Sequence, residues 1–391
     1  MNRGWKEYGL FELCNLLDTQ RRPISKMERD KMQGSYPYYG ASGIVDYIND
    51  YIYSEDTILI SEDGENLNTR NTPIAFRARG KYWVNNHAHV LRPQKDYFFP
   101  IIINYIEQMD LSSFITGAVQ PKLSQENLSK IKIFLPILEN EQRAIAGVLS
   151  GLDDKIDLLH RQNKTLEGMA ETLWRKMFLE GVDAGWAVGK LGDIAIVQNG
   201  FAFKSSEYVS FIDGYLEVLK MGHIQPGGGL RTAPKTDFVP REDRLTKYIL
   251  LKGDIVMAMT DMKDNVVILG NPAMIDIGDK YVLNQRVARI YLKSNDKLMD
   301  SRLLYVQLKD PEFISILQSK ANSGVQVNLS TESIKDCDIL IPPIDVQIEK
   351  GATIIKAYLK KENNDYQIRT LSHMRGTLLP KLMSGEVRVQ L

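Results

Sequence analysis

The sequence has little cysteine, no long hydrophobic run and no excess of charge of either sign. Its two cysteines, Cys14 and Cys337, lie far apart, which argues against a disulfide framework or a zinc motif and predicts two core residues. No apolar stretch approaches the roughly 20 residues that span a bilayer, and Met1–Lys6 precedes no apolar segment of a signal peptide. We therefore expect a globular, cytoplasmic protein without a membrane segment.

Motifs of catalysis and cofactor binding are also missing. His87 and His89 would share one face of a strand, but no third ligand follows at a suitable spacing, so we expect no metal site. The glycines 227–229 lack the lysine of a phosphate-binding loop and predict a flexible loop. Residues 271–274 resemble the Asn-Pro-Pro-aromatic signature of amino-methyltransferases without its second proline and its ring, and predict a turn. We expect no catalytic residue, metal or cofactor in this chain.

The 49 basic and 49 acidic side chains cancel, whereas binding to DNA phosphates usually goes with a basic excess. The balance varies along the chain. Residues 1–138 and 184–344 are each neutral, but residues 139–183 hold 6 basic and 9 acidic side chains, and residues 345–391 hold 8 and 5. The two shorter segments carry opposite charge. This difference favours their pairing, although exposed ion pairs contribute only about 0–1 kcal/mol each.

What the sequence does contain is an internal repeat. The run Leu123–Pro136 returns as Leu329–Pro342, and Thr165–Lys176 returns as Thr370–Lys381, with one residue lost between the two runs. Between these anchors the two halves diverge in sequence and length. A duplicated unit with constant joints and a changed middle predicts one scaffold that presents two different surfaces.

The first of the shorter segments has the spacing of a coiled-coil helix. Its apolar residues alternate at intervals of three and four over about four heptads, between a start at Glu139 and a stop at Gly181 and Gly185. At 1.5 Å per residue, some 40 residues make a rod of about 60 Å. The second copy begins after residues 342–343, and Pro380 is expected to kink or end it.

These two helices predict an antiparallel coiled coil with pseudo-two-fold symmetry, because each is the obvious partner of the other. Asn163 opposite Asn364, or opposite a nearby polar residue, would fix the register. The alternative is that each helix packs on its own globular domain. The seam is expected at Leu149, Leu152, Ile156, Leu159, Asn163, Leu166, Leu173, Ile354, Ile368, Leu371 and Leu378.

The two longer blocks, 1–138 and 184–344, alternate short β-rich runs with helical stretches, which predicts an α+β fold for each. Helices are expected near residues 97–109 and 303–319. The expected strands are 57–60, 83–84 and 90–91 in the first block and 254–259, 282 and 290–291 in the second.

Several motifs in these blocks resemble target-recognition domains. Tyr36–Ile44, upstream of Asn86–Leu91, is similar to one branch of such domains, and Gly200–Ser205 is similar to the glycine-aromatic-lysine entry of another. The joints at residues 116–124 and 323–330, each before a proline-ended strand and a long helix, are similar to the exits of these domains. Over essentially its whole length the chain resembles the specificity (S) subunits of Type I restriction-modification systems.

The resemblance implies two globular target-recognition domains of mixed helix and strand, separated by two long helices. The first domain would cover residues 1–138, the first spacer helix 139–183, the second domain 184–344 and the second spacer helix 345–391. It also implies a non-catalytic subunit that reads a bipartite target in double-stranded DNA for host defence and DNA methylation. Its partners would be two modification methyltransferase subunits and restriction/translocase subunits. S-adenosylmethionine, ATP and Mg would be bound by those partners only.

DNA contacts would come from basic, hydroxyl and aromatic side chains near these motifs, which suit phosphate oxygens and base edges. For each such residue the alternative is an ordinary solvated surface, or, for the tyrosine, a ring that braces a loop. The candidates are Arg21, Arg22, Lys26, Arg29, Lys31, Tyr38, Ser42 and Lys122 in the first block, and Lys204, Ser205, Arg231, Lys263 and Arg286 in the second.

Two other functions compete with DNA recognition. A coiled-coil adaptor whose variable blocks bind proteins or carbohydrates would suit the neutral charge, and an exposed apolar patch would favour it. Basic residues on one concave face would favour DNA. An autonomous methyltransferase or nuclease is opposed by the missing motifs.

Overall fold

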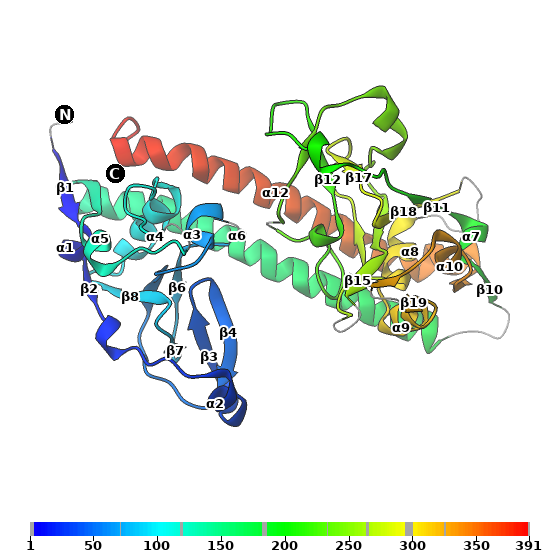
Figure 1. Cartoon of the computed structure of the whole chain (residues 1–391), viewed down its shortest axis with the longest axis horizontal. Helices are drawn as coiled ribbons and strands as arrows, with labels where there is room; N and C mark the ends of the chain where they lie inside the picture. Colours follow the sequence, from blue (N-terminus) through cyan, green and yellow to red (C-terminus); the bar gives the residue numbers. More distant parts are fainter. Residues whose placement is uncertain are drawn as a thin grey trace. The chain divides into compact units, whose positions relative to one another are not determined.

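The computed structural model describes residues 4–70, 72–117, 120–181, 186–232, 234–262, 266–293, 300–323 and 326–389. The chain forms two compact units, Met1–Leu159 with Gln367–Leu391 and His160–Tyr366, called here the first and the second unit. Both units combine sheets with helices (Figure 1), which confirms the expected α+β class. None of the described helices is long and apolar enough to cross a membrane.

The first unit is built on three small sheets. The fully buried run Thr57–Ser61 forms β5, an inner strand of a four-stranded antiparallel sheet with the order β2-β8-β5-β6. A second sheet has the order β4-β3-β7, with β3 and β7 parallel, and β1 pairs with β9. The strands are β1 Trp5–Gly9, β2 Cys14–Leu16, β3 Gln33–Gly40, β4 Gly43–Ile48, β5 Thr57–Ser61, β6 Ala75–Ala78, β7 Trp83–Val84, β8 Ala88–Pro93 and β9 Lys132–Pro136.

Helix α4 (Phe98–Gln108) closes the core of this unit, because its buried apolar residues share one cluster with the four-stranded sheet and with the first turns of α6 (Glu139–Trp174). Tyr97 Oη donates to Gln142 Oε1 over 3.1 Å, and Asn104 Nδ2 donates to Asp153 Oδ2 over 2.9 Å. Cys14 is a free, buried residue of this core, as expected. The short helices are α1 Leu10–Leu13, α2 Lys26–Lys31, α3 Asn66–Thr69 and α5 Gln125–Ser129.

The second unit holds sheets of the order β11-β18-β14-β16, β13-β12-β17, β15-β20-β19 and β10-β21. The strands are β10 Ala187–Lys190, β11 Ala195–Asn199, β12 Leu216–Leu219, β13 Phe238–Val239, β14 Ile255–Ala258, β15 Thr260–Met262, β16 Pro272–Met274, β17 Tyr281–Leu283, β18 Val287–Leu292, β19 Asn322–Ser323, β20 Gln326–Asn328 and β21 Asp338–Ile341. The shorter helices are α7 Leu191–Ile194, α8 Ser301–Leu308, α9 Pro311–Ser319, α10 Thr331–Lys335 and α11 Ile344–Glu349.

One expected helix is divided in two. The stretch 303–319 forms α8 and α9, because Pro311 lacks the amide hydrogen that a continuous helix would need and instead begins α9. The Asp310 side chain caps α9 by accepting a hydrogen bond from the Glu312 amide.

The repeat in the sequence is a repeat of the fold. Order and direction agree in the four-stranded sheets, where β2, β8, β5 and β6 correspond to β11, β18, β14 and β16. The parallel pair β3 and β7 corresponds to β12 and β17, and β1 with β9 corresponds to β10 with β21. The two units therefore use one scaffold, as the repeat predicts.

Two long helices contribute to both units. Helix α6 begins at Glu139, as expected, and continues after Trp174 as a π-helical turn through Leu179. Of the expected stops, Gly181 follows this turn, whereas Gly185 lies outside the described residues. Helix α12 runs from Gly351 to Ser384 and passes through Pro380, so the expectation that this proline ends the helix was wrong. Its missing amide deprives only the Gly376 carbonyl, one turn earlier, of a helical hydrogen bond, and the helix ends four residues later at Ser384.

The two helices run antiparallel within each unit. In the first unit Arg375 of α12 faces Asp153 of α6, with 2.7 Å between Nη1 and Oδ1, and Leu379 and Leu382 share a core cluster with Ile145 and Leu149. In the second unit Asn364 faces Asn163 and Lys361 faces Glu167. Leu149, Leu159, Asn163 and Ile354 of the expected seam are buried. The half-buried seam residues are Leu152, Ile156, Leu166, Leu173, Ile368, Leu371 and Leu378.

One expectation for the second unit was wrong. Residues 272–274 are an edge strand, β16, paired with β14, and not a turn. The glycines 227–229 all have positive φ and are held on that strand: the Asn271 Oδ1 accepts from the Gly227 amide, and the Pro272 carbonyl accepts from the Gly229 amide. The positive φ of all three residues is a conformation that favours glycine.

Candidate nucleic-acid interface

The same tight turn occurs in both units, between the short parallel strand and the long strand that follows it. In the first unit Asn85 begins the turn, donating its amide to the Tyr39 carbonyl and accepting from the His87 amide on Oδ1 over 2.8 Å. In the second unit Asn284 donates to the Leu219 carbonyl and accepts from the Arg286 amide over 3.2 Å. The turns end alike, because the His87 and Arg286 carbonyls accept from the residue that follows β5 or β14.

The residues displayed on this common turn differ. Asn86 and His87 are exposed in the first unit, and Gln285 and Arg286 are exposed in the second. Each turn thus displays an amide side chain followed by a side chain that can carry positive charge. The sequence marked Arg286 as a DNA candidate and considered His87 only as a metal ligand. Asn86 and Gln285 were not among the DNA candidates. The repeat could have indicated them, because each follows an asparagine, Asn85 or Asn284, at equivalent positions of the two halves.

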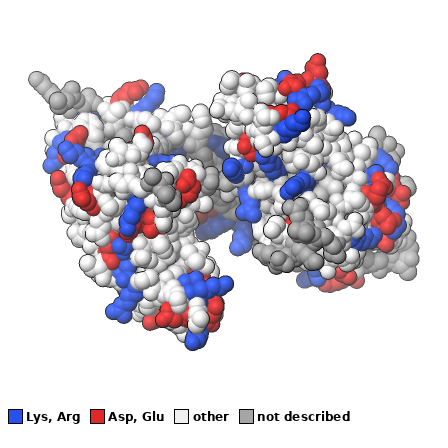
Figure 2. Space-filling view, viewed as in Figure 1, with Lys and Arg blue, Asp and Glu red and all other residues white. Residues whose placement is uncertain are grey.

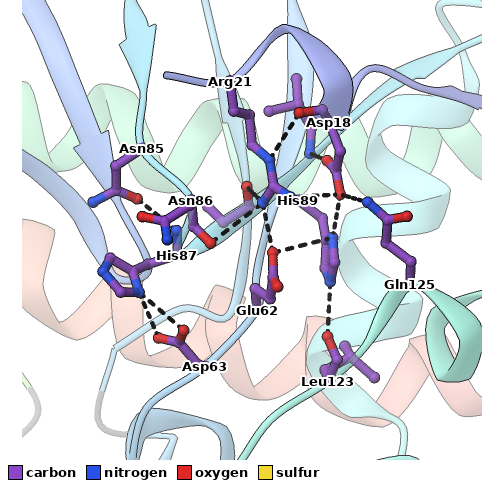
Figure 3. Close-up of polar contacts among 12 residues, drawn as sticks. Asp18, Arg21, Glu62, Asp63, Asn85, Asn86, His87, His89, Leu123 and Gln125 are labelled. Atoms are coloured by element: carbon purple, nitrogen blue, oxygen red, sulfur yellow. Dashed lines mark hydrogen bonds and ion pairs between the residues drawn. The ribbon is translucent and has the colours of Figure 1, made fainter. Parts of the chain in front are cut away.

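A buried polar network lies beside the turn of the first unit (Figure 3). His89 of β8 is fully buried; its Nδ1 lies 2.6 Å from Asp18 Oδ2 and its Nε2 lies 2.8 Å from the Leu123 carbonyl. Both partners are hydrogen-bond acceptors, so these two bonds require hydrogen on both ring nitrogens and hence an imidazolium. Arg21 adds a second cation, with Nη1 2.6 Å from Glu62 Oε2 and Nη2 3.1 Å from Asp18 Oδ2.

These contacts set the charge of both acids. Burial by itself would raise the pKa of Asp18, but the hydrogen bond and charge of His89, the Val90 amide and the Arg21 guanidinium together hold that pKa below its ordinary value. Glu62 behaves in the same way: burial raises its pKa, and the hydrogen bond from Arg21 with the charge of His89 brings it below the ordinary value. Both carboxylates are therefore ionised and paired at neutral pH.

Asp18, Glu62 and His89 also have the donor types of a metal site, and one donor atom from each lies within 4.8 Å of the others. The Arg21 guanidinium already contacts both carboxylates, and His89 uses both ring nitrogens. This arrangement braces the fold. The expectation that His87 and His89 share one strand face was wrong, because His87 lies in the turn, where its Nδ1 contacts Asp63 at 2.9 Å.

The second unit has no such ionic group at the equivalent place among its described residues. The strand registers align Glu62 with Met259 and His89 with Ala288, and both of the latter belong to the apolar core cluster of that unit. The two units therefore share a backbone arrangement, but a charged network stabilises it in the first unit and apolar packing does so in the second.

The candidate residues of the first block fall into two groups. Arg21, Arg29 and Tyr38 are committed to internal contacts: Arg29 pairs with Asp46 at 3.0 Å and lies over the ring of Tyr38, whose side chain is 1% exposed. Lys122 contacts Glu62 at 3.2 Å but is half exposed. The freely exposed candidates are Arg22, Lys26 and Lys31 around α2 and Ser42 in the β3–β4 turn.

The second block shows the same division. Arg231 is exposed, although its Nε contacts the Ile224 carbonyl at 3.2 Å. Lys204, Ser205 and Arg286 are exposed, and within the described residues their side chains make no ion pair. Lys263 lies outside the described residues. On the face shown in Figure 2, acidic side chains lie among the basic ones in both units, so the positive charge there is local.

Comparison with known proteins connects this doubled scaffold to a family. A family described as the Type I restriction modification DNA specificity domain matches residues 2–168 and again residues 183–370. The chain belongs to this family. The two matches follow the repeat, one for each half of the chain.

Specificity subunits from one archaeon are similar to this chain. The MjaVIII specificity subunit of Methanocaldococcus jannaschii is 26% identical over 403 residues, covering 93% of this chain and 89% of the relative. The MjaIX specificity subunit of the same organism is 24% identical over 373 residues, covering 88% and 82%. A crystal structure of an S subunit from M. genitalium has the same fold, with a TM-score of 0.57, 17% identity, and coverage of 97% of this chain and 96% of that one.

Family membership gives a coarse function. The chain is a Type I restriction-modification specificity subunit, a class whose role is the recognition of a DNA target and whose members are generally non-catalytic. The repeated scaffold of this specificity subunit is consistent with two target-recognition domains.

Proposed function

We propose that each unit of this specificity subunit reads one half of a split sequence in double-stranded DNA, and that the chain itself performs no catalysis. The observation that carries the proposal is the repeat of one strand order in both units. A scaffold used twice in one chain suits two adjacent readings of one duplex, as dimeric DNA-binding proteins read paired half-sites. The divergent side chains of the two units then allow two different half-sites.

The long helices would dock the modification methyltransferase subunits. Met169 of α6 and Met374 of α12 are equivalent in the repeat, and their exposed fractions are 40% and 43%. Exposed apolar residues at equivalent places suit two copies of one partner, because methionine adapts to a binding surface. S-adenosylmethionine would bind to these subunits, and ATP and Mg to the restriction/translocase subunits that complete a cytoplasmic complex.

The deciding experiment is a genome-wide map of adenine methylation in cells that hold the methyltransferase subunits with and without this chain. We expect a two-part motif that depends on the chain. Replacing residues 184–344 with the same block of another specificity subunit should change one half of the motif and leave the other intact. If deletion of that block left the whole motif unchanged, the proposal would be wrong.

One observation favours an adaptor as the second candidate. The β3–β4 hairpin exposes Ile44, Val45 and Tyr47, which are apolar side chains suited to a protein partner. The methylation map separates the two candidates, since an adaptor would produce no motif of its own.

A further inference from the structure

The turns at residues 85–87 and 284–286 are fixed by neighbours that leave little freedom. A side chain at Gly200 would place its Cβ 2.2 Å from the Asn284 carbonyl oxygen, so only glycine fits there, and Phe201 exchanges backbone hydrogen bonds with Leu283 and Gln285. In the first unit, a Cβ at Gly40 would lie 3.3 Å from the side-chain nitrogen Nδ2 of Asn85. Glycine-bearing segments thus brace both turns closely.

The residues within the turns have the chemistry of base reading. In the major groove an arginine bonds guanine O6 and N7, and the amide of asparagine or glutamine bonds adenine N6 and N7. Gln285-Arg286 holds both of these side-chain types, and Asn86-His87 holds the amide followed by an imidazole. Within the described residues, the side chains of Asn86, Gln285 and Arg286 make no hydrogen bond or ion pair of their own.

His87 differs from Arg286 in being oriented by a partner. Its Nδ1 lies 2.9 Å from both carboxylate oxygens of Asp63, so Nδ1 carries hydrogen and Nε2 is left for another partner. Its side chain is 47% exposed, and in Figure 3 the ring lies apart from the buried His89 network. An oriented imidazole can accept from an exocyclic base amino group when neutral and donate to guanine when charged.

We propose that Asn86-His87 and Gln285-Arg286 are equivalent base-reading dipeptides, which contact base edges in the first and the second half-site respectively. The proposal rests on the proposed function and deepens it by naming the contacts. It also explains why the repeat has kept Asn85 and Asn284 while the next two residues differ. The asparagine shapes the turn, and the dipeptide selects the base pair.

The test maps adenine methylation in a methylation-free host that carries the chain with its methyltransferase subunits. Arg286→Gln should relax or change one base pair of one half-site, lowering the discrimination there about tenfold or more, and leave the other half-site unchanged. His87→Ala should do the same in the opposite half-site. Replacing Asn86-His87 by Gln-Arg, as Asn86→Gln with His87→Arg, should shift the first half-site preference instead of abolishing it.

The exposed Lys132 and the half-buried Lys335 serve as matched controls. Lys132→Ala on β9 and Lys335→Ala on α10 remove positive charges that lie outside the turns, so the motif should stay unchanged. If Arg286→Gln reduced methylation equally at all sites with the same consensus, its contact would be to phosphate and the inference would be overturned. An unchanged map would overturn it as well. A wild-type chain that produces no motif would contradict the proposed function itself, which is a different result.

Discussion

Asn364 of α12 donates a hydrogen bond from Nδ2 to Oδ1 of Asn163 in α6, over 2.9 Å, inside the seam of the second unit. Asn163 donates in turn to Asp365 Oδ1 over 2.6 Å. Asn364 is fully buried and Asn163 is 6% exposed. This buried contact favours one register, because a slip along the seam would separate the two amides, although Asn364 Oδ1 itself has no partner among the described residues.

We expect Asn364→Leu to lower the free energy of unfolding by about 1–3 kcal/mol, because Asn163 Oδ1 loses its buried donor. Asn163→Leu combined with Asn364→Leu should recover most of this loss, since both buried amides are then absent and the partly exposed Asp365, which loses its Asn163 donor, keeps Lys361 as a partner. Denaturant unfolding midpoints measure both effects. The exposed neighbour Asn363→Leu is the control and should change the midpoint little. A double variant as unstable as the single one would refute the pairing argument.

The sequence predicts the helices and this register well, because their signals are local or periodic. The three-four spacing locates α6, and the polar seam positions locate Asn163 and Asn364. The strands 57–60 and 90–91 follow from short apolar runs. The break between α8 and α9 and the passage of α12 through Pro380 were missed, because a proline removes one hydrogen bond to the carbonyl four residues before it, and the surrounding contacts decide whether the helix tolerates that loss.

The polar contacts of the first unit could not be predicted in this way. Asp18 and His89 are 71 residues apart in sequence, and their contact exists only because η1 (Asp18–Gln20) follows the strand that pairs with β8. Arg21 looks like any surface arginine in the sequence, and only the fold shows that it pairs internally. The sequence indicates which candidate side chains have suitable chemistry for DNA contact. Only the structure shows which of them are exposed.

The network around His89 predicts a stability that depends on acid pH. Asp18→Asn should lower the free energy of unfolding at pH 7 by about 3 kcal/mol, because it leaves two buried cations short of a partner. The pKa values of Asp18 and Glu62 are depressed in the folded state, so their contribution is present above the ordinary carboxyl pKa of about 4 and is lost as pH falls through the folded values.

Wild-type stability should therefore decline steeply below about pH 4, and the decline should be shallower in Asp18→Asn. Thermal unfolding between pH 2 and 7 measures this difference. Asp30→Asn, at an exposed position of α2, is the control and should follow the wild-type curve. Parallel curves for wild type and Asp18→Asn would show that the network does not govern acid unfolding.

Arg29 and Lys31 lie two residues apart in α2 but should behave differently. Lys31 is exposed, so Lys31→Ala should leave unfolding unchanged within about 0.5 kcal/mol, weaken DNA binding evenly across sequences, and reduce the slope of log affinity against log salt by about one. Arg29 donates to the Ile24 carbonyl at 2.7 Å and to Asp46, so Arg29→Ala should destabilise the hairpin by about 1–3 kcal/mol. Salt titrations of the assembled complex and melting curves distinguish the two. Equal effects of Arg29→Ala and Lys31→Ala on stability and on DNA binding would contradict the distinction between an internally paired Arg29 and an exposed Lys31.

The last prediction concerns the spacer between the half-sites. If α6 and α12 set it, shortening both by two turns should shorten it. Removing residues 158–164 and 363–369 takes matched segments from the antiparallel pair, so that Glu167 still faces Lys361 and Asp153 still faces Arg375. At 1.5 Å per residue the helices lose about 10 Å, which corresponds to roughly two or three base pairs of duplex.

Methylation mapping should then find both half-sites unchanged and the spacer reduced. Removing residues 158–164 alone puts the remaining side chains of α6 out of register with α12, and it should lower stability and abolish the motif instead of shortening it. An unaltered spacer in the matched deletion would show that something other than the helices sets the distance, while leaving the reading of each half-site untouched.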